Sequence, residues 1–152
     1  MLLIKGDKIC TQSFSFVLPQ GLSIITDPTN VKADILTFET SDGRFVLDIG
    51  ASDYNKPPLE EIERLKSDSE VIILSEIKEI VRGNMKGYGV FYSGEEWRHI
   101  YYQEFLEYPI NDEGQAAFRL CIEHEADGCL NVAALEEFMA LPNIKAFTDS
   151  IA

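Results

Sequence analysis

The chain has 152 residues, 45% of them hydrophobic and 11% aromatic, which is enough for a single domain over residues 1–152 with a core that needs no disulfide or metal. Its 26 acidic residues outnumber its 13 basic residues, giving a formal net charge of −13. A surface of this charge repels nucleic acids and anionic membranes, which both bind through clustered lysine and arginine, so we expect neither as a partner.

The first predicted element is a strand over residues 13–18. In an extended segment Phe14 and Phe16 point to one face, and small or polar residues alternate with them. Pro19 cannot donate to a sheet ladder and Gly21 permits a turn, so the strand is expected to end there.

A hairpin and a helix are predicted next. The dipeptide Asp42-Gly43 lies between two β-rich runs, which is a strong turn signal. Pro57 and Pro58 suit the first positions of a helix that ends near residues 67–69. The expected apolar stripe of this helix is Leu59, Ile62 and Leu65. The predicted strands before it are residues 22–25, 34–39 and 44–49.

The second half is predicted to be a meander of four strands followed by a closing helix. Ile73, Ile77 and Ile80 also have helical spacing, but the β-branched run at residues 71–73 favours a strand. The closing helix starts after Asn131, and Pro142 breaks or restarts it. The predicted strands are residues 71–82, 85–92, 97–107 and 115–125.

This order of elements, strand-strand-helix-strands-helix, predicts an α+β fold. Its centre is expected to be an antiparallel sheet of about six to seven strands, with helices packed on it. The pattern resembles the Mog/PsbP-like superfamily, through Phe14-Ser15-Phe16-Val17-Leu18-Pro19-Gln20-Gly21, the strand from Gly83 to Tyr92 after a turn, and the terminal Phe147-x-x-Ser150-Ile151. Leu22 stands where members usually carry an aromatic residue. The resemblance implies an adaptor or binding role without catalysis, and the superfamily hosts several unrelated functions.

The strands from residue 85 to residue 107 suggest a candidate binding surface. With a turn at residues 93–96, Tyr92 would lie opposite Trp97, and Tyr88 opposite Tyr101. The two-residue period then gathers five side chains on one face: Tyr88, Tyr92, Trp97, His99 and Tyr101. Large rings with polar tips are enriched at recognition surfaces. A helix over this face would instead make the rings a second core layer, and a register slip of one residue would exchange the two faces.

The opposite face of the same strands is expected to form the main core. It would hold Gly87, Gly89, Phe91, Ile100, Tyr102 and Leu106, joined by Phe118, Leu120 and Ile122 of the next strand.

Motifs for catalysis or metal binding are lacking in the sequence. There is no Gly-x-Ser-x-Gly, phosphate-binding glycine loop or His-Glu-x-x-His. His99 and His124 have no ligand or nucleophile–base spacing, so paired or hydrogen-bonded structural roles are expected for both. We therefore assign no catalytic residue, no metal and no cofactor, while an enzyme built from scattered residues stays open.

The cysteines and the apolar runs bear on the cellular compartment. Cys10, Cys121 and Cys129 fit no zinc or redox spacing, which indicates a reducing environment, and Cys121 is interpreted as a small core residue. The apolar run at residues 1–4 is too short for a signal peptide, and none approaches the roughly 18 to 20 residues that span a bilayer. A cytoplasmic protein is predicted.

The acidic residues are concentrated in the C-terminal part. Residues 91–152 carry a net charge of −9, from 12 acidic and 3 basic side chains. A solvated shell that keeps the chain soluble is the simpler reason, but such a surface could also steer a basic partner. We expect a non-catalytic protein-binding or adaptor module whose partner has a basic or amphipathic surface. The alternatives are a small-molecule-binding domain or enzyme with an aromatic pocket, an acidic inhibitor of a basic protein, and a homodimer interface on the same face.

Overall fold

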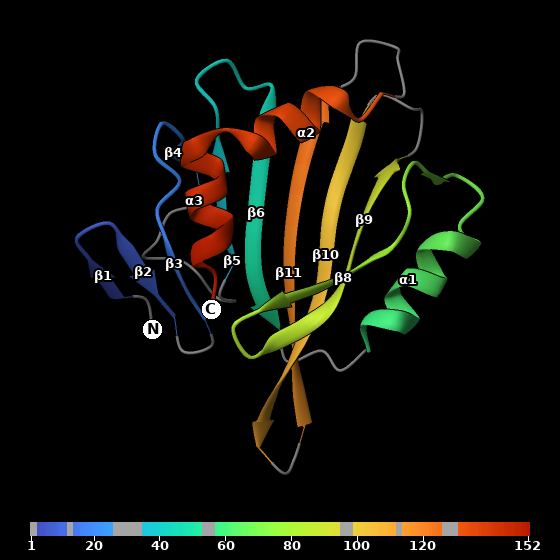
Figure 1. Cartoon of the computed structure of the whole chain (residues 1–152), viewed down its shortest axis with the longest axis horizontal. Coiled ribbons are helices and arrows are strands. Elements are labelled where there is room, and N and C mark those ends of the chain that lie inside the picture. The colour runs from blue at the N-terminus through green and yellow to red at the C-terminus, as the bar shows by residue number, and fades with distance from the viewer. Residues whose placement is uncertain are drawn as a thin grey trace.

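A computed structural model of the chain describes residues 3–11, 14–25, 35–52, 57–94, 99–111, 114–125 and 131–152. These residues form a small and a large antiparallel sheet with helices packed on both faces of the large one (Figure 1). The small sheet has the order β1-β2-β3, with strands Leu3–Lys5, Lys8–Cys10 and Ser15–Val17. The first two strands were not predicted. They have only three residues each, and they are joined by a tight turn at Gly6, whose φ is +65°.

The predicted α+β fold with an antiparallel sheet is confirmed. The large sheet has eight strands in the described residues, against the six to seven predicted, because residues 71–82 contribute two strands. The order is β4-β5-β6-β11-β10-β9-β7, and β8 also pairs with β9. The strand bounds are β4 Ser23–Ile24, β5 Ile35–Glu39, β6 Phe45–Ser52, β7 Ile72–Ile73, β8 Lys78–Arg82, β9 Met85–Ser93, β10 His99–Asn111 and β11 Gly114–Glu125. The predicted single strand over residues 71–82 is in fact two short strands, which pair with different parts of β9.

The first face of the large sheet carries the main core. Helices α2 (Ala133–Ala140) and α3 (Pro142–Ser150) lie on this face, and Pro142 restarts the helix as predicted (Figure 1). Asn131 Oδ1 accepts a hydrogen bond from the backbone N–H of Ala133 at 2.9 Å, which fits its predicted capping role. The predicted core residues of β10 and β11 are buried here: Ile100, Tyr102, Leu106, Phe118, Leu120 and Ile122.

The opening strand is part of this core, as its alternating pattern predicts. Phe16 is fully buried, and its ring meets those of Phe38 and Phe147 edge to face at 6.1 and 5.3 Å. The backbone of Ser15 exchanges two hydrogen bonds with Ala152, of 2.8 and 3.0 Å. The small sheet is thereby tied to the end of the chain.

Helix α1 (Pro58–Ser67) covers part of the second face. Ile62 and Leu65 pack against Val90 of β9 and Phe105 of β10. The prediction that Leu59 belongs to the buried stripe is wrong, because its side chain is 55% exposed. The buried positions are Pro58, Glu61, Ile62 and Leu65, which keep the i, i+3, i+4, i+7 spacing with a different start. None of the described helices is long and apolar enough to cross a membrane.

Candidate functional site

The second face of the large sheet carries the side chains that the sequence predicts to gather. In the structure Tyr101 pairs with Tyr92, and Phe105 pairs with Tyr88. The predicted partners of Tyr92 and Tyr88 were therefore wrong by four residues, because the connection between the strands is longer than expected. An even shift leaves each described side chain of β9 and β10 on its predicted face. Trp97 lies outside the described residues.

Helix α1 covers two of these tyrosines, so a part of the face is a second core layer. Tyr88 and Tyr92 pack against the cluster of Ile62, Leu65, Val90 and Phe105. The hydroxyl of Tyr92 donates to Gln103 Oε1 at 2.6 Å. Burial raises the pKa of the Tyr92 hydroxyl well above its ordinary value, so it stays a hydrogen-bond donor at neutral pH.

Tyr101 is less covered and lies next to this layer. Its ring stacks on Tyr92 with 5.1 Å between the ring centroids and an interplanar angle of 22°. A Cβ on Gly94 would lie 2.8 Å from Cε2 of Tyr101, so the glycine leaves room for the ring. Burial, and then the charge of Glu123, raise the pKa of the Tyr101 hydroxyl. The ring is thus held in place and keeps its hydroxyl proton.

His99 and Glu123 form the edge of this cluster. His99 Nε2 lies 3.4 Å from Glu123 Oε1, and its ring centroid lies 6.3 Å from that of Tyr101. The side chain of His99 is 39% exposed and that of Glu123 is 32% exposed. His99 is therefore paired, as predicted, and the pair is open to solvent. Tyr92, His99, Tyr101 and Glu123 are called the Tyr101 cluster below.

An open groove of about 340 Å³ continues from Gln103 across β11, β6 and β5, beyond the strands on which α1 packs. Small and apolar residues form most of its surface, and Asp48, Arg119 and Gln103 are its polar members. Asp48 Oδ1 accepts a hydrogen bond from the Thr37 hydroxyl. The groove lining consists of Ile35, Asp48, Ile49, Gly50, Ala51, Gln103, Ala117, Arg119 and Cys121.

The surroundings hold the Arg119 side chain of the groove in position and keep the Cys121 thiol protonated. Arg119 lies 5.0 Å from the centroid of the Phe105 ring, and its Nη1 donates to the Phe118 carbonyl at 2.8 Å. Cys121, which was predicted to be a small core residue, is half-buried and lines the groove on the second face. Burial, followed by the charge of Asp48, raises the pKa of its thiol to about 12. A thiol that stays protonated is a poor nucleophile, so the groove favours binding over cysteine chemistry.

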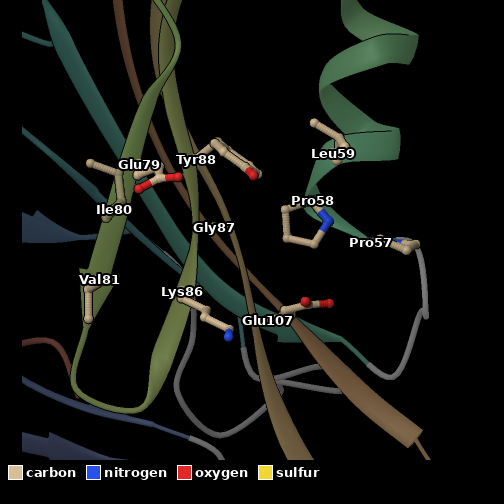
Figure 2. A pocket seen from close by; sticks show the side chains of 10 residues that line it. All are labelled: Pro57, Pro58, Leu59, Glu79, Ile80, Val81, Lys86, Gly87, Tyr88 and Glu107. Atoms are coloured by element: carbon tan, nitrogen blue, oxygen red, sulfur yellow. The ribbon is translucent and has the colours of Figure 1, made fainter.

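Tyr88 belongs to a different cavity, between the start of α1 and the hairpin of β8 and β9 (Figure 2). This cavity measures about 370 Å³. The predicted set of site residues is therefore divided. Tyr88 lines the cavity at the start of α1, whereas Tyr92, His99 and Tyr101 belong to the Tyr101 cluster. Tyr88 and Tyr92 are four residues apart on β9, about 13 Å along a strand.

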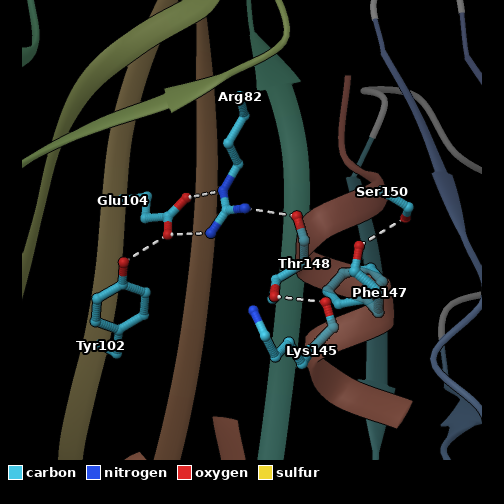
Figure 3. Close-up of polar contacts among 7 residues, drawn as sticks. All are labelled: Arg82, Tyr102, Glu104, Lys145, Phe147, Thr148 and Ser150. Atoms are coloured by element: carbon cyan, nitrogen blue, oxygen red, sulfur yellow. Dashed lines mark hydrogen bonds and ion pairs between the residues drawn. The ribbon is translucent and has the colours of Figure 1, made fainter. Parts of the chain in front are cut away.

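A buried polar cluster in the main core was missed by the sequence reasoning. Arg82 of β8 donates from Nε and Nη2 to the Glu104 carboxylate at 2.6 and 2.7 Å, and the Tyr102 hydroxyl donates to the same carboxylate at 2.5 Å (Figure 3). Arg82 Nη1 also donates to the carbonyl of Thr148 in α3 at 2.5 Å. Every polar group of the cluster is satisfied within the protein, which indicates a structural role. The available signal was the glutamate at position 104, between Tyr102 and Leu106 on the core face of the strand.

His124 is structural, as predicted. It is 5% exposed, its ring stacks on Phe45 with 4.6 Å between centroids, and its Nδ1 lies 3.4 Å from the Arg44 carbonyl. The flanking Glu123 belongs to the other face. Within the described ranges, no three histidine, cysteine, aspartate or glutamate side chains are close enough together to hold a metal ion.

No protein-family model and no curated protein matches the chain. Two of the solved structures that match share its fold. One is a protein from Bacteroides thetaiotaomicron VPI-5482, with a TM-score of 0.50, 14% identity and a match over 98% of this chain and 48% of that one. The chain thus spans about half the length of that protein.

The second structure is the Ran-binding protein Mog1p of Saccharomyces cerevisiae. It matches with a TM-score of 0.52 and 9% identity, over 99% of this chain and 96% of Mog1p. Identities this low establish the fold alone. The chain therefore shares its fold with Mog1p along almost its whole length, and membership of the Mog/PsbP-like superfamily stays a prediction.

Proposed function

We propose that the protein is a non-catalytic binding module that takes a protein partner on the second face of its large sheet. The observation that carries this proposal is the position of Tyr101. Its ring is fixed between Tyr92 and Gly94. It is two residues along β10 from Gln103, on the same face, where the open groove begins. A rigid aromatic side chain next to an open groove is typical of an anchor residue at a protein interface.

The charge of the chain supports a basic or amphipathic partner. Glu123 in the Tyr101 cluster and Asp48 in the groove are both partly exposed carboxylates. They belong to a chain with a net charge of −13, of which −9 falls on residues 91–152. An acidic face increases the rate at which a basic partner associates, and salt weakens this effect.

The shared fold is consistent with this role. Mog1p is a Ran-binding protein, and the present chain matches 96% of its length. The identity of the partner does not transfer at 9% identity, so we propose only the class of partner, a protein. We also propose, from the composition, a single domain and a cytoplasmic location.

A small-molecule ligand is the second candidate, and the volume of the groove favours it. About 340 Å³ lies at the lower end of the range for small-ligand sites. The groove is open, however, whereas such sites enclose most of their ligand. An acidic inhibitor of a basic protein is a special case of the first proposal, with steeper salt dependence.

Recovery of partners from the native cell tests the proposal. Four forms of the protein are immobilised and exposed to lysate at low and at high salt: wild type, Tyr101→Ala, Trp97→Ala and the control Leu141→Ala. Leu141 is 47% exposed between α2 and α3, away from the candidate surface. A partner that Tyr101→Ala and Trp97→Ala lose, that the control keeps, and that salt weakens, supports the proposal. If both tyrosine and tryptophan variants keep every partner, the surface is wrongly assigned. Sedimentation of wild type and Tyr101→Ala tests the homodimer on the same face.

A further inference from the structure

We propose a second binding site, the cavity between α1 and the β8–β9 hairpin, which takes an apolar side chain flanked by lysine or arginine from a protein partner. This inference rests on the proposed function in one respect, that the partner is a protein with a basic or amphipathic surface. The cavity lies on the same face of the sheet as the Tyr101 cluster, on the side where α1 begins.

The two walls of the cavity are apolar and well separated. Pro58 and Leu59 at the start of α1 form one wall, and Tyr88 of β9 and Val81 of β8 form the other (Figure 2). Val81 is 74% exposed and Leu59 is 55% exposed. Large apolar side chains left in solvent on both sides of one cavity gain stability when an apolar group is placed between them.

The walls are held rigidly, so little ordering is needed when a ligand binds. Consecutive prolines at positions 57 and 58 fix the backbone where α1 begins. The ring of Tyr88 packs against the cluster that α1 forms with β9 and β10. Gly87 lies at the floor, where a Cβ would collide with the carbonyl oxygen of Phe105. The glycine therefore lets β9 and β10 approach closely beneath the cavity.

The charged groups at the cavity favour a cation. Glu79 of β8 and Glu107 of β10 line it together with the single cation Lys86. Among the described side chains, none forms an ion pair with Glu79 or with Glu107. Lys86 lies opposite Glu107 in the backbone register, and the charge of Arg119, outside the cavity, also acts on Glu107. Among the residues that line the cavity, two carboxylates stand against one ammonium group. A ligand with an additional positive charge completes this balance.

Apolar walls and carboxylates together define the occupant. A leucine-sized side chain fits between Pro58 and Tyr88, and a neighbouring lysine or arginine reaches Glu79 or Glu107. About 370 Å³ is enough for one such side chain and part of the next. Val81 and Leu59, at the exposed rim of the cavity, then contact the partner residues on either side of the inserted side chain. A neutral apolar small molecule would use the walls and leave the carboxylates without a role.

The test uses two labelled peptides as probes, one of alternating leucine and arginine and one of alternating leucine and glutamate. Binding to the full chain is measured by fluorescence anisotropy at low and high salt. We expect the arginine peptide to bind and the glutamate peptide not to bind. Val81→Ser removes the apolar side chain that Val81 adds to one wall. Glu107→Gln and Glu79→Gln each remove one carboxylate. We expect each variant to weaken binding about threefold or more, a change typical of exposed contacts.

Matched controls separate this site from general effects of charge and hydrophobicity. Leu141→Ser changes an exposed apolar residue elsewhere, and Glu137→Gln changes an exposed carboxylate of α2. Both should bind the arginine peptide as the wild type does, and urea midpoints should show that every variant is folded. The inference is overturned if the three cavity variants bind the arginine peptide like the wild type, or if the controls lose as much binding. It is also overturned if the glutamate peptide binds as well as the arginine peptide.

The outcome is independent of the Tyr101 cluster. Tyr101→Ala should retain the arginine peptide, because Tyr101 lies outside the cavity. Loss of native partners in Tyr101→Ala, with unchanged peptide binding in the cavity variants, would refute this inference alone. If Tyr101→Ala keeps all partners while Val81→Ser loses the peptide, the cavity binds and the proposed surface is wrong.

Discussion

Arg82 and Glu104 form a two-point ion pair inside the main core, with N–O distances of 2.6 and 2.7 Å (Figure 3). The side chain of Glu104 is fully buried and that of Arg82 is 15% exposed. Arg82 also donates to Thr148, so the pair connects β8, β10 and the last turn of α3. A cation at the C-terminal end of a helix is favourable in addition, because the helix dipole is negative there.

Removal of one partner should be strongly destabilising. Arg82→Met leaves the Glu104 carboxylate buried without its cation, and we expect a loss of about 3–5 kcal/mol in the free energy of unfolding. Urea denaturation followed by circular dichroism measures it. The control Lys145→Met breaks the exposed pair with Asp149, and should cost less than about 1 kcal/mol. The double variant Arg82→Met/Glu104→Gln should be more stable than Arg82→Met alone, and the opposite order would contradict this account.

The hydroxyl of Tyr102 should contribute separately. It donates to the same carboxylate of Glu104, and burial raises its pKa well above the ordinary value. Tyr102→Phe removes this donor and should cost about 2 kcal/mol, typical of a hydrogen bond to a charged group. Gly89→Ala tests the geometry, because its Cβ would lie 2.7 Å from the hydroxyl oxygen. In the Tyr102→Phe background the alanine should cost less. Equal costs in the two backgrounds would show that the hydroxyl is not what the glycine accommodates.

The faces of β9 and β10 could be predicted from the sequence, although their pairing could not. Side-chain direction depends only on whether the shift in register is even or odd. The predicted partner of Tyr88 was Tyr101 and the observed one is Phe105, a shift of four residues. The turn signal at Ser93-Gly94 marked where β9 ends, but no residue pattern indicated the length of the connection. For the described residues, the face of each side chain was therefore predicted correctly while its cross-strand neighbour was not.

The division of the predicted site by α1 depends on tertiary packing. The stripe of α1 was predicted to begin at Leu59, and the buried positions begin instead at Pro58. Sequence periodicity establishes that a helix has an apolar face, but not which strands that face covers. In this protein α1 covers Tyr92 and leaves Tyr101 more open, a difference that no local pattern encodes.

Cys121 should be unreactive at neutral pH. Its pKa is raised from 9.0 to about 12, first by burial and then by the charges of Asp48 and Glu123. In a Cys10→Ser/Cys129→Ser variant, iodoacetamide at pH 8 should react with the folded protein about two to three orders of magnitude more slowly than with the urea-unfolded chain. A rate in the folded state close to the unfolded rate would place the thiol in solvent and contradict the described groove.

The same shift predicts a loss of stability at alkaline pH. The folded state holds the Cys121 proton more tightly than the unfolded state, so stability from this group is complete below pH 9 and falls as the pH rises toward about 12. Cys121→Ala should therefore flatten the decline of the urea midpoint between pH 9 and pH 11. The decline that remains in this variant should come from Tyr92 and Tyr102, whose pKa values are also raised by burial. An unchanged slope would remove Cys121 from this account.

Replacing Gly94 should weaken partner binding, because this glycine leaves room for the ring of Tyr101. The Gly94→Ala variant places a Cβ 2.8 Å from Cε2 of Tyr101, so the ring has to leave its stack on Tyr92. We expect the fold to persist, with a cost of about 1 kcal/mol or less, because the displaced Tyr101 ring is partly exposed and moves toward solvent. The near-ultraviolet circular dichroism of the tyrosines should change, and capture of native partners should fall as it does for Tyr101→Ala. The double variant Gly94→Ala/Tyr101→Ala should lose no more than Tyr101→Ala does. If Gly94→Ala alters the tyrosine signal and still captures partners like the wild type, the position of the Tyr101 ring is not what the partner recognises.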